Sequence, residues 1–289
     1  MKAHSNLMRQ TGFTLIELMI SLTLGLVIML AAVQLFITNQ MGFNLQRGMG
    51  NVQENGRFAL DYINVSTRNS EYSRDGTTSA SDASGVITEA VELPGVAAAA
   101  NLVSSNNLTT LGVGSSDQLV IRQWISDSMP NFRDCEGNSV ASGRFVVSRY
   151  FVRADTAAGS PAALACDAGF YADGAASVSN YGDNGVVLLS TIDTFQILFG
   201  IAATPTPPIG QRVPVRYMTV TDYMALPAPR PVISALRVGV LVKSSEKTGN
   251  NFVAPTNIQV LDVTVSGNDI NDKSVHRLFT STLALRNAM

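Results

Sequence analysis

The stretch "RQTGFTLIELMISLTLGLVIML", residues 9–30, is an apolar run that contains a single acid, Glu17. From Phe13 to Ile37 there are 25 residues, and Glu17 is their only ionisable side chain. As a helix, this segment would measure about 37 Å at about 1.5 Å per residue, which is long enough to cross a bilayer. An acid in such a segment costs free energy, so its presence indicates a function rather than simple anchoring.

The residues ahead of the run predict its orientation. Lys2, His4 and Arg9 precede it without any acid, so the positive-inside rule keeps the start of the chain in the cytoplasm and the remainder on the other side. The run is longer than the apolar core of a secretory signal, and no A-x-A-like cleavage site follows it. The segment is therefore expected to be retained, and a simple single-span anchor is the alternative.

Composition excludes several classes of function. The 289 residues include 20 basic and 22 acidic ones without a basic stripe, which argues against binding to nucleic acid. The two cysteines, Cys135 and Cys166, are not spaced as paired metal ligands. In an exported region they predict one disulfide, and two free thiols are the alternative, although no C-x-x-C motif supports redox chemistry.

The residues Gly12-Phe13-Thr14-Leu15-Ile16-Glu17-Leu18 resemble the processing motif of type IV prepilins and of the pseudopilins of type II secretion. The resemblance implies that a prepilin peptidase cuts between Gly12 and Phe13 and that Phe13 is then N-methylated. It implies a leader at residues 1–12 and a transmembrane and filament-core helix at residues 13–38.

Processing would give Glu17 a cationic partner. A new amine on Phe13 has an ordinary pKa near 8 and lies four residues from Glu17 on the same helical face. The resemblance implies that Glu17 of an incoming subunit pairs with the Phe13 amine of a subunit already in the filament. A pair within one chain is the alternative.

The helix is expected to continue into the aqueous phase as a soluble half, residues 39–72. Pro94 is the first proline, so no earlier residue breaks the helix. Apolar or small residues recur at spacings of three and four and predict a helix to about residue 70 with one packed face: Leu45, Met49, Val52, Gly56, Ala59 and Ile63.

Residues 73–289 are expected to form a strand-rich periplasmic domain. Residues 73–117 are rich in Ser, Thr, Ala, Gly and Asn and predict a long loop or a poorly ordered excursion. Eight later segments have the β-branched and aromatic composition of strands: 118–125, 144–154, 185–190, 193–201, 215–223, 232–244, 257–265 and 275–287. Since no helical pattern separates them, the fold class is α+β, with the long N-terminal helix packed on an antiparallel sheet.

The segment "VISALRVGVLVKS", residues 232–244, predicts a half-buried strand. Alternate positions are apolar, whereas Arg237 and Lys243 fall on the opposite face.

Two further stretches, "QENGRFALDYI" (53–63) and "RLFTSTLALRN" (277–287), resemble the helix and last-strand signatures of minor pilins of the PilW type. The resemblance implies a pilin-like fold and a structural subunit that helps initiate or cap a type IV pilus, the fimbrium of twitching motility. Its partners would be other minor and major pilins, the prepilin peptidase and the inner membrane. Before assembly the C-terminal domain would lie in the periplasm, and afterwards the protein would be in the filament or at its tip.

Two other functions fit the same sequence features. One is a minor pseudopilin of a type II secretion system, and the other is an adhesive module at a pilus tip, with residues 73–230 as the binding part.

Enzymatic chemistry is not predicted. The histidines are His4 in the leader and His276, which is expected to be a surface or interstrand residue. No P-loop, G-x-G-x-x-G, H-E-x-x-H or G-x-S-x-G motif occurs, and "GNDINDKS" (267–274) places Lys273 where a calcium loop needs an oxygen ligand. This turn is expected to be exposed, and no catalytic residue, metal, cofactor or small-molecule substrate is expected.

Overall fold

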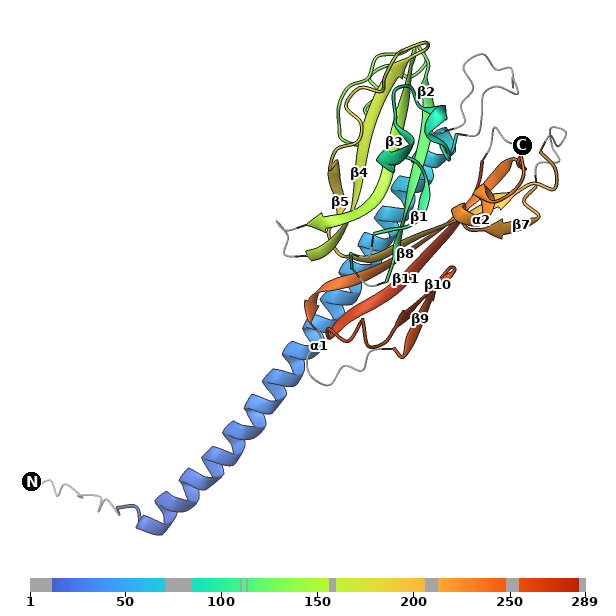
Figure 1. The fold of residues 1–289 in the computed structure, drawn as a ribbon. Helices are drawn as coiled ribbons and strands as arrows, with labels where there is room; N and C mark the ends of the chain where they lie inside the picture. Colours follow the sequence, from blue (N-terminus) through green and yellow to red (C-terminus); the bar gives the residue numbers. More distant parts are fainter. Residues whose placement is uncertain are drawn as a thin grey trace, which may run out of the picture.

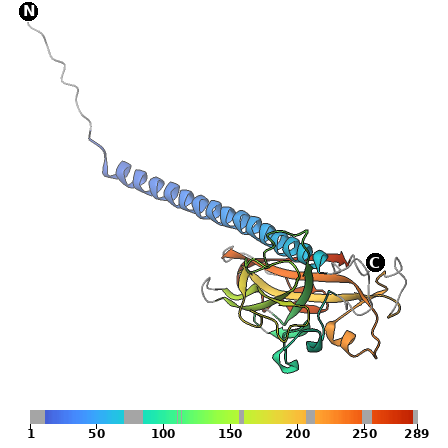
Figure 2. The same ribbon diagram turned by 90° about the horizontal axis from the view of Figure 1, so that it is seen from above.

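The computed structural model describes residues 12–70, 85–109, 111–112, 114–155, 160–205, 213–247 and 255–285. The fold consists of one long helix, α1, and a head built from antiparallel sheets (Figure 1). Seen from above, the first half of α1 projects away from the head, and only its second half lies against the strands (Figure 2). The fold is therefore α+β with a long N-terminal helix, as the sequence predicted.

Helix α1 runs from Leu15 to Asn69, so it ends where the sequence placed its end. The predicted packed face is correct from Val52 onward, but Met49 is 42% exposed and Gly48 is buried instead. A Cβ on Gly48 would lie 3.2 Å from the Cβ of Ser244. The helix thus approaches a strand so closely at this turn that a glycine faces the sheet and the methionine side chain points away.

The first sheet contains five strands in the order β1-β2-β3-β4-β5, with every neighbouring pair antiparallel. It is a meander, because strands adjacent in the sequence are adjacent in the sheet. Its strands are β1 (Ser105–Thr109), β2 (Ser116–Ile125), β3 (Arg144–Asp155), β4 (Ser160–Ala172) and β5 (Val186–Leu189).

The second sheet contains four strands in the order β11-β8-β6-β7, and a separate hairpin pairs β9 with β10. Strands β8 and β11, in orange and red, lie along the second half of α1 (Figure 1). The bounds are β6 (Ile192–Ile201), β7 (Arg216–Met218), β8 (Ile233–Lys247), β9 (Asn257–Val260), β10 (Val263–Ser266) and β11 (Ser274–Ala284).

One hydrophobic core joins α1 to both sheets. It includes Val52 and Ile63 of the helix, Tyr150 of β3, Phe195 of β6 and Val240 of β8, all fully buried. Because burial of each large apolar side chain contributes about 1.5–3 kcal/mol, this shared core fixes the helix on the head without any contribution from the first half of α1.

The prediction of a half-buried strand at residues 232–244 was wrong. Strand β8 is buried on both faces, because Leu241 packs against Val260, Val265 and Ile270 on the side away from α1. Arg237 is only half-buried, and its guanidinium lies 4.3 Å from the centre of the Tyr217 ring. The hairpin β9–β10 covers the face that was expected to meet water.

The prediction of a long loop at residues 73–117 is only partly right: residues 71–84 lie outside the described part of the chain, residues 85–104 are mostly irregular, and β1 and the start of β2 are strands. Two short 3₁₀ helices, η1 (Ala90–Glu92) and η2 (Ala98–Ala100), lead into β1. Ile87 and Leu93 are buried against Val120 and Val147. The segment is ordered by packing on a sheet distant in the sequence, which local composition does not reveal.

Three further differences concern strands. Strand β4 was not predicted, because its Ala and Gly residues have low strand propensity. Residues 215–223 contain only the short β7, followed by helix α2 (Val220–Met224), whose N-cap Thr219 accepts a hydrogen bond from the Asp222 amide. Residues 257–265 form the hairpin β9–β10 rather than one strand.

Candidate functional site

The N-terminus of α1 is held by a reciprocal pair of contacts between Thr14 and Glu17. The Glu17 amide donates to Thr14 Oγ1 at 3.3 Å, and the Thr14 amide donates to Glu17 Oε2 at 3.1 Å. The Thr14 hydroxyl also donates to Glu17 Oε2 at 3.1 Å. These contacts form a capping box, which satisfies two backbone donors that the first helical turn leaves without partners.

This capping role of Glu17 was not predicted from the sequence, although Thr14-x-x-Glu17 is the usual pattern of a capping box. Glu17 therefore has a local function within its own chain. In the intact chain Phe13 has a peptide nitrogen, so the expected ion pair between the Phe13 amine and Glu17 requires cleavage and stays a prediction.

The first half of α1 has no packing partner among the residues that the structure describes. Every residue from 12 to 41 is exposed, and the apolar side chains of Phe13, Ile16 and Phe36 are 88%, 66% and 67% exposed. The helix is long and apolar enough to cross a membrane, with a mean hydropathy of 2.4 in its most apolar window. So large an exposed apolar surface must be covered by lipid or by other protein.

The hydroxyl groups of this half are satisfied within the helix. Ser21 Oγ donates to the Glu17 carbonyl at 2.6 Å, Thr23 Oγ1 to the Ile20 carbonyl at 2.9 Å, and Thr38 Oγ1 to the Gln34 carbonyl at 2.9 Å. A polar side chain bonded to its own backbone is cheaper to place in an apolar environment than an unpaired one. These residues therefore do not oppose insertion of the helix.

The second half of α1 is tied to the second sheet by side-chain amides. Asn55 donates to Thr191 at 3.1 Å, and Asn64 donates to Ser281 of β11 at 3.2 Å. These contacts flank the apolar face of the helix and fix its rotation on the strands. The head is thereby presented in one orientation relative to the apolar half.

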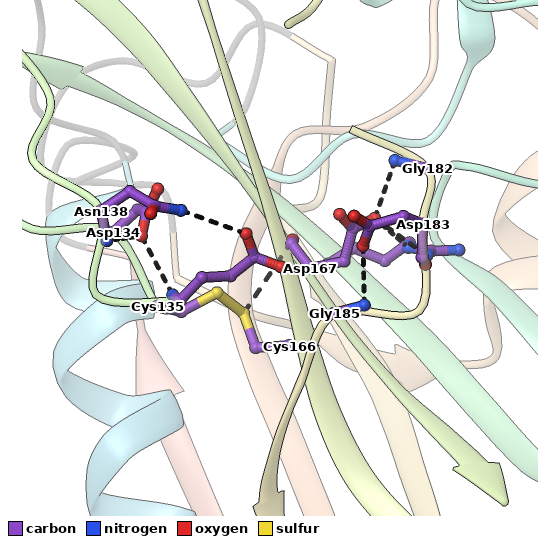
Figure 3. The surroundings of a disulfide bond; sticks show 10 residues. Asp134, Cys135, Asn138, Cys166, Asp167, Gly182, Asp183 and Gly185 are labelled. Carbon is purple, nitrogen blue, oxygen red and sulfur yellow. Dashed lines mark hydrogen bonds and ion pairs between the residues drawn. A yellow bond between two sulfur atoms is a disulfide. The ribbon is translucent and has the colours of Figure 1, made fainter. Parts of the chain in front are cut away.

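Cys135 and Cys166 form a disulfide, which joins the segment between β2 and β3 to the middle of β4 (Figure 3). The Asp134 side chain accepts hydrogen bonds from the amides of Glu136 and Asn138 at 3.0 and 2.8 Å. The bond therefore anchors a compact turn to the first sheet.

His276 lies between strands, as the sequence allowed, but its side chain is fully buried rather than on the surface. Its Nδ1 lies 2.5 Å from Asp193 Oδ2, and its Nε2 lies 2.9 Å from Asp272 Oδ1. Burial lowers the pKa of His276, but the hydrogen bonds and charges of Asp193 and Asp272 outweigh burial and raise it above its ordinary value. An enclosed imidazole held by two acids is a structural group.

The turn at residues 267–274 was expected to be exposed, but only part of it is. Ile270 is fully buried beneath the hairpin β9–β10, and Asp272 accepts hydrogen bonds from the Ser274 amide and from His276. Lys273 has a left-handed backbone with φ of 65°.

Comparison with known families shows which class of protein the chain resembles. A family model described as the prokaryotic N-terminal methylation motif matches residues 7–33, which include Gly12, Phe13 and Glu17. The chain is thus similar to type IV pilin-like proteins with a prepilin processing motif. A second model, described as type IV pilus-assembly protein W (PilW), matches residues 149–287, from β3 to beyond β11. The resemblance predicted from the two ends of the chain is confirmed.

The comparisons with curated proteins and with solved structures are less informative than the two family models. No curated protein matches the chain. Among solved structures, a type IV-like pilin from Thermus thermophilus is similar at 15% sequence identity, over 64% of this chain and 86% of that chain, with a TM-score of 0.35.

Proposed function

We propose that this protein is a minor pilin of a type IV pilus, a structural subunit that helps initiate or cap the filament together with other minor and major pilins. The observation that carries the proposal is the helix α1, whose first half is apolar and exposed along its length while its second half packs in the core of the head. The matches to the methylation motif and to pilus-assembly protein W support a pilin-type role.

The proposed route begins in the inner membrane. A prepilin peptidase cuts between Gly12 and Phe13 and N-methylates Phe13, with the head in the periplasm. The exposed apolar half of α1 is then transferred from lipid to contacts with neighbouring helices in the filament. The transfer keeps this surface out of water at every stage, since each Å² of apolar surface left in water costs about 25 cal/mol.

Glu17 supplies the register of this packing. Inside a bundle of apolar helices a carboxylate needs a cation, and the Phe13 amine created by cleavage of a neighbouring subunit provides one. The capping box holds the Glu17 side chain at the helix terminus, on the same turn as Thr14. The charge of Glu17 thus has an assembly role, and its hydrogen bonds to Thr14 have a separate role in helix capping.

Two substitutions separate these roles. Glu17→Gln removes the charge but retains a capping box, because glutamine serves at this position as glutamate does. Thr14→Val keeps the charge and removes the hydroxyl that accepts from the Glu17 amide. Glu54→Gln is the matched control, since Glu54 is an exposed acid in the soluble half of the same helix.

The measurement is the ratio of surface-sheared major pilin to total cellular pilin, in a strain that lacks the native gene and carries each variant. We expect wild type, Glu54→Gln and Thr14→Val to restore piliation and Glu17→Gln to fail, with mass spectrometry showing mature protein that begins at Phe13 in all four. Normal piliation with Glu17→Gln would refute the pairing. Normal piliation without the gene would favour a secretion pseudopilin or a tip adhesin, which levels of exported enzymes and attachment assays would then distinguish.

A further inference from the structure

Three carboxylates from separate segments meet beside the disulfide. Glu136 follows Cys135 in the turn between β2 and β3, Asp167 follows Cys166 in β4, and Asp183 lies in the segment between β4 and β5. Each residue offers one oxygen, and these three oxygens all lie within 4.8 Å of one another. Figure 3 shows Asp167 and Asp183 close together next to the Cys135–Cys166 bond.

One carboxylate oxygen of Asp167 has no hydrogen-bond partner among the residues that the structure describes. Its side chain is fully buried, and its Oδ2 accepts from Arg149 Nε and from the Gly182 amide, both at 2.9 Å. Its Oδ1 is buried and has no hydrogen-bond donor among the described residues. Buried carboxylate oxygens are nearly always satisfied, so this one indicates a ligand that supplies positive charge.

The charge of the cluster fits a divalent ion. Three ionised carboxylates carry three negative charges, and the Arg149 guanidinium, 2.8 Å from Asp167 Oδ2, supplies one positive charge. The resulting charge of −2 is matched by one divalent cation. Without such an ion, Glu136 and Asp183 repel each other and Asp167 at short range.

The loops that carry the carboxylates are held in place by other contacts. Gly185 has a left-handed φ of 55°, and a Cβ there would lie 2.2 Å from the Cys166 carbonyl oxygen. The Gly185 amide donates to Asp183 Oδ1 at 2.7 Å. On the other side, the disulfide holds the turn of Glu136 against β4. The oxygens are therefore already gathered, and binding needs little rearrangement.

The side of the cluster formed by Glu136 and Asp183 is open to solvent, whereas Asp167 is buried behind it. A hollow of about 470 Å³ is lined by Glu136, Asn138, Asp183 and Asn184, among others. Water molecules can reach the cluster through it and complete a coordination shell. The Asn138 side-chain amide donates to Glu136 Oε2 at 3.3 Å, so a fourth oxygen-bearing side chain lies at the edge of the site.

We propose that Glu136, Asp167 and Asp183 bind one Ca²⁺ ion. Ca²⁺ takes six to eight oxygen ligands in a flexible geometry, so three carboxylates and several waters suffice. Mg²⁺ fits less well, because it needs a near-ideal octahedron at shorter distances. The ion would join the turn before β3, the strand β4 and the segment before β5 at one point. This site is independent of the proposed role in pilus assembly.

The test is isothermal titration calorimetry of CaCl₂ into the full chain, purified in detergent micelles and freed of metal with EDTA. The variant is Glu136→Gln together with Asp183→Asn, because both residues are partly or fully exposed and neither takes part in the Arg149–Asp167 pair. Asp127→Asn is the matched control, since Asp127 is an exposed acid in the same connection between β2 and β3.

Wild type and Asp127→Asn are expected to bind one Ca²⁺ per chain, with a dissociation constant of about 10⁻⁴–10⁻³ M or tighter, as in extracellular modules. The double variant should bind at least about 100-fold more weakly, and MgCl₂ should give weaker binding than CaCl₂. A thermal midpoint raised by Ca²⁺ in wild type, but not in the double variant, would be the second readout. Absence of binding at millimolar Ca²⁺, or unchanged binding by the double variant, would overturn the proposal, and equal binding of Mg²⁺ would overturn the choice of Ca²⁺.

Discussion

At Gly56, helix α1 crosses strand β11 too closely for any side chain. A Cβ at this position would lie 2.2 Å from Phe279 Cδ2 and 2.3 Å from Phe279 Cε2. Glycine weakens a helix by about 1 kcal/mol relative to alanine, yet here it allows an aromatic ring to pack directly on the backbone. Gly50, six residues earlier, faces open space instead.

Alanine substitutions at these two glycines should have opposite effects. Gly56→Ala should lower the free energy of unfolding by about 1–3 kcal/mol, because the ring of Phe279 or the helix must move. Gly50→Ala should raise it by up to about 1 kcal/mol, because nothing opposes the added methyl group and the helix propensity improves. Urea unfolding of the full chain in detergent, followed by tryptophan fluorescence, measures both values. Equal stabilisation by both substitutions would show that Phe279 yields without cost.

At the scale of elements, buried charges connect three strands of the second sheet on the face away from α1. Asp193 of β6 is fully buried between His276 of β11 and Lys243 of β8, with Lys243 Nζ 3.7 Å from Asp193 Oδ1. Asp272, just before β11, contacts both cations, at 2.9 Å from His276 Nε2 and 4.0 Å from Lys243 Nζ. The cluster therefore depends on the protonation of His276.

This arrangement predicts a loss of stability as pH rises. The pKa of His276 is raised above its ordinary value of 6.5, so the folded state holds the proton more tightly than the unfolded state does. The stabilisation is fully present below pH 6.5 and is lost as pH rises through the folded-state pKa. Thermal midpoints of wild type between pH 5 and pH 9 should therefore fall more steeply than those of His276→Gln. Parallel profiles for the two proteins would contradict this role.

Protonation of Asp272 determines where the stability contributed by the same cluster is lost at acid pH. Burial raises its pKa, but the hydrogen bonds from His276 and Ser274 and the charges of His276 and Lys243 lower it below its ordinary value of 3.8. Its contribution is present above pH 3.8 and is lost as pH falls through the lowered pKa. The cluster is thus most stabilising between the ordinary pKa values of Asp272 and His276.

The elements differ in how much of them the sequence could predict. Helix α1 was predictable because its spacing of apolar residues and its lack of proline are local features. Strand β4 was not predictable, because its small residues are required by close neighbours in the folded chain. A Cβ on Gly169 would lie 2.5 Å from the Cβ of Tyr181, so only a glycine is accommodated there. The packing of segment 85–104 was not predicted for a related reason, since Ile87 and Leu93 are buried against residues distant in the sequence.

For the whole molecule, the disulfide is the covalent link within the head. With 30 residues between Cys135 and Cys166, the chain-entropy estimate of its contribution is about 3–4 kcal/mol. The double substitution Cys135→Ala and Cys166→Ala should lower the free energy of unfolding by about that amount, measured by urea unfolding without reductant. Wild type in reductant should approach the variant. Equal stability of the oxidised wild type and the double variant would contradict this contribution.

Whether a candidate site could be predicted from the sequence depends on whether its residues are contiguous in the chain or are brought together by folding. The motif from Gly12 to Glu17 is contiguous, so it was recognised directly, and the capping box lay within it. The three carboxylates come from different segments, and only the pairing of β3 with β4 and β4 with β5 brings them together. Such a cluster has no signature in the linear chain.

The position of the capping box has a consequence for the order of events in maturation. Thr14 and Glu17 both lie after the bond that we propose is cut, and the backbone of Thr14 is extended, with φ of −78° and ψ of 152°. Gly12 and Phe13 are exposed and lie outside the helix, as proteolysis favours. If the chain is cut between Gly12 and Phe13, as we propose, the cleavage requires no unwinding of α1. Cleavage at the proposed bond would shorten the chain ahead of α1 and leave the fold of the helix unchanged.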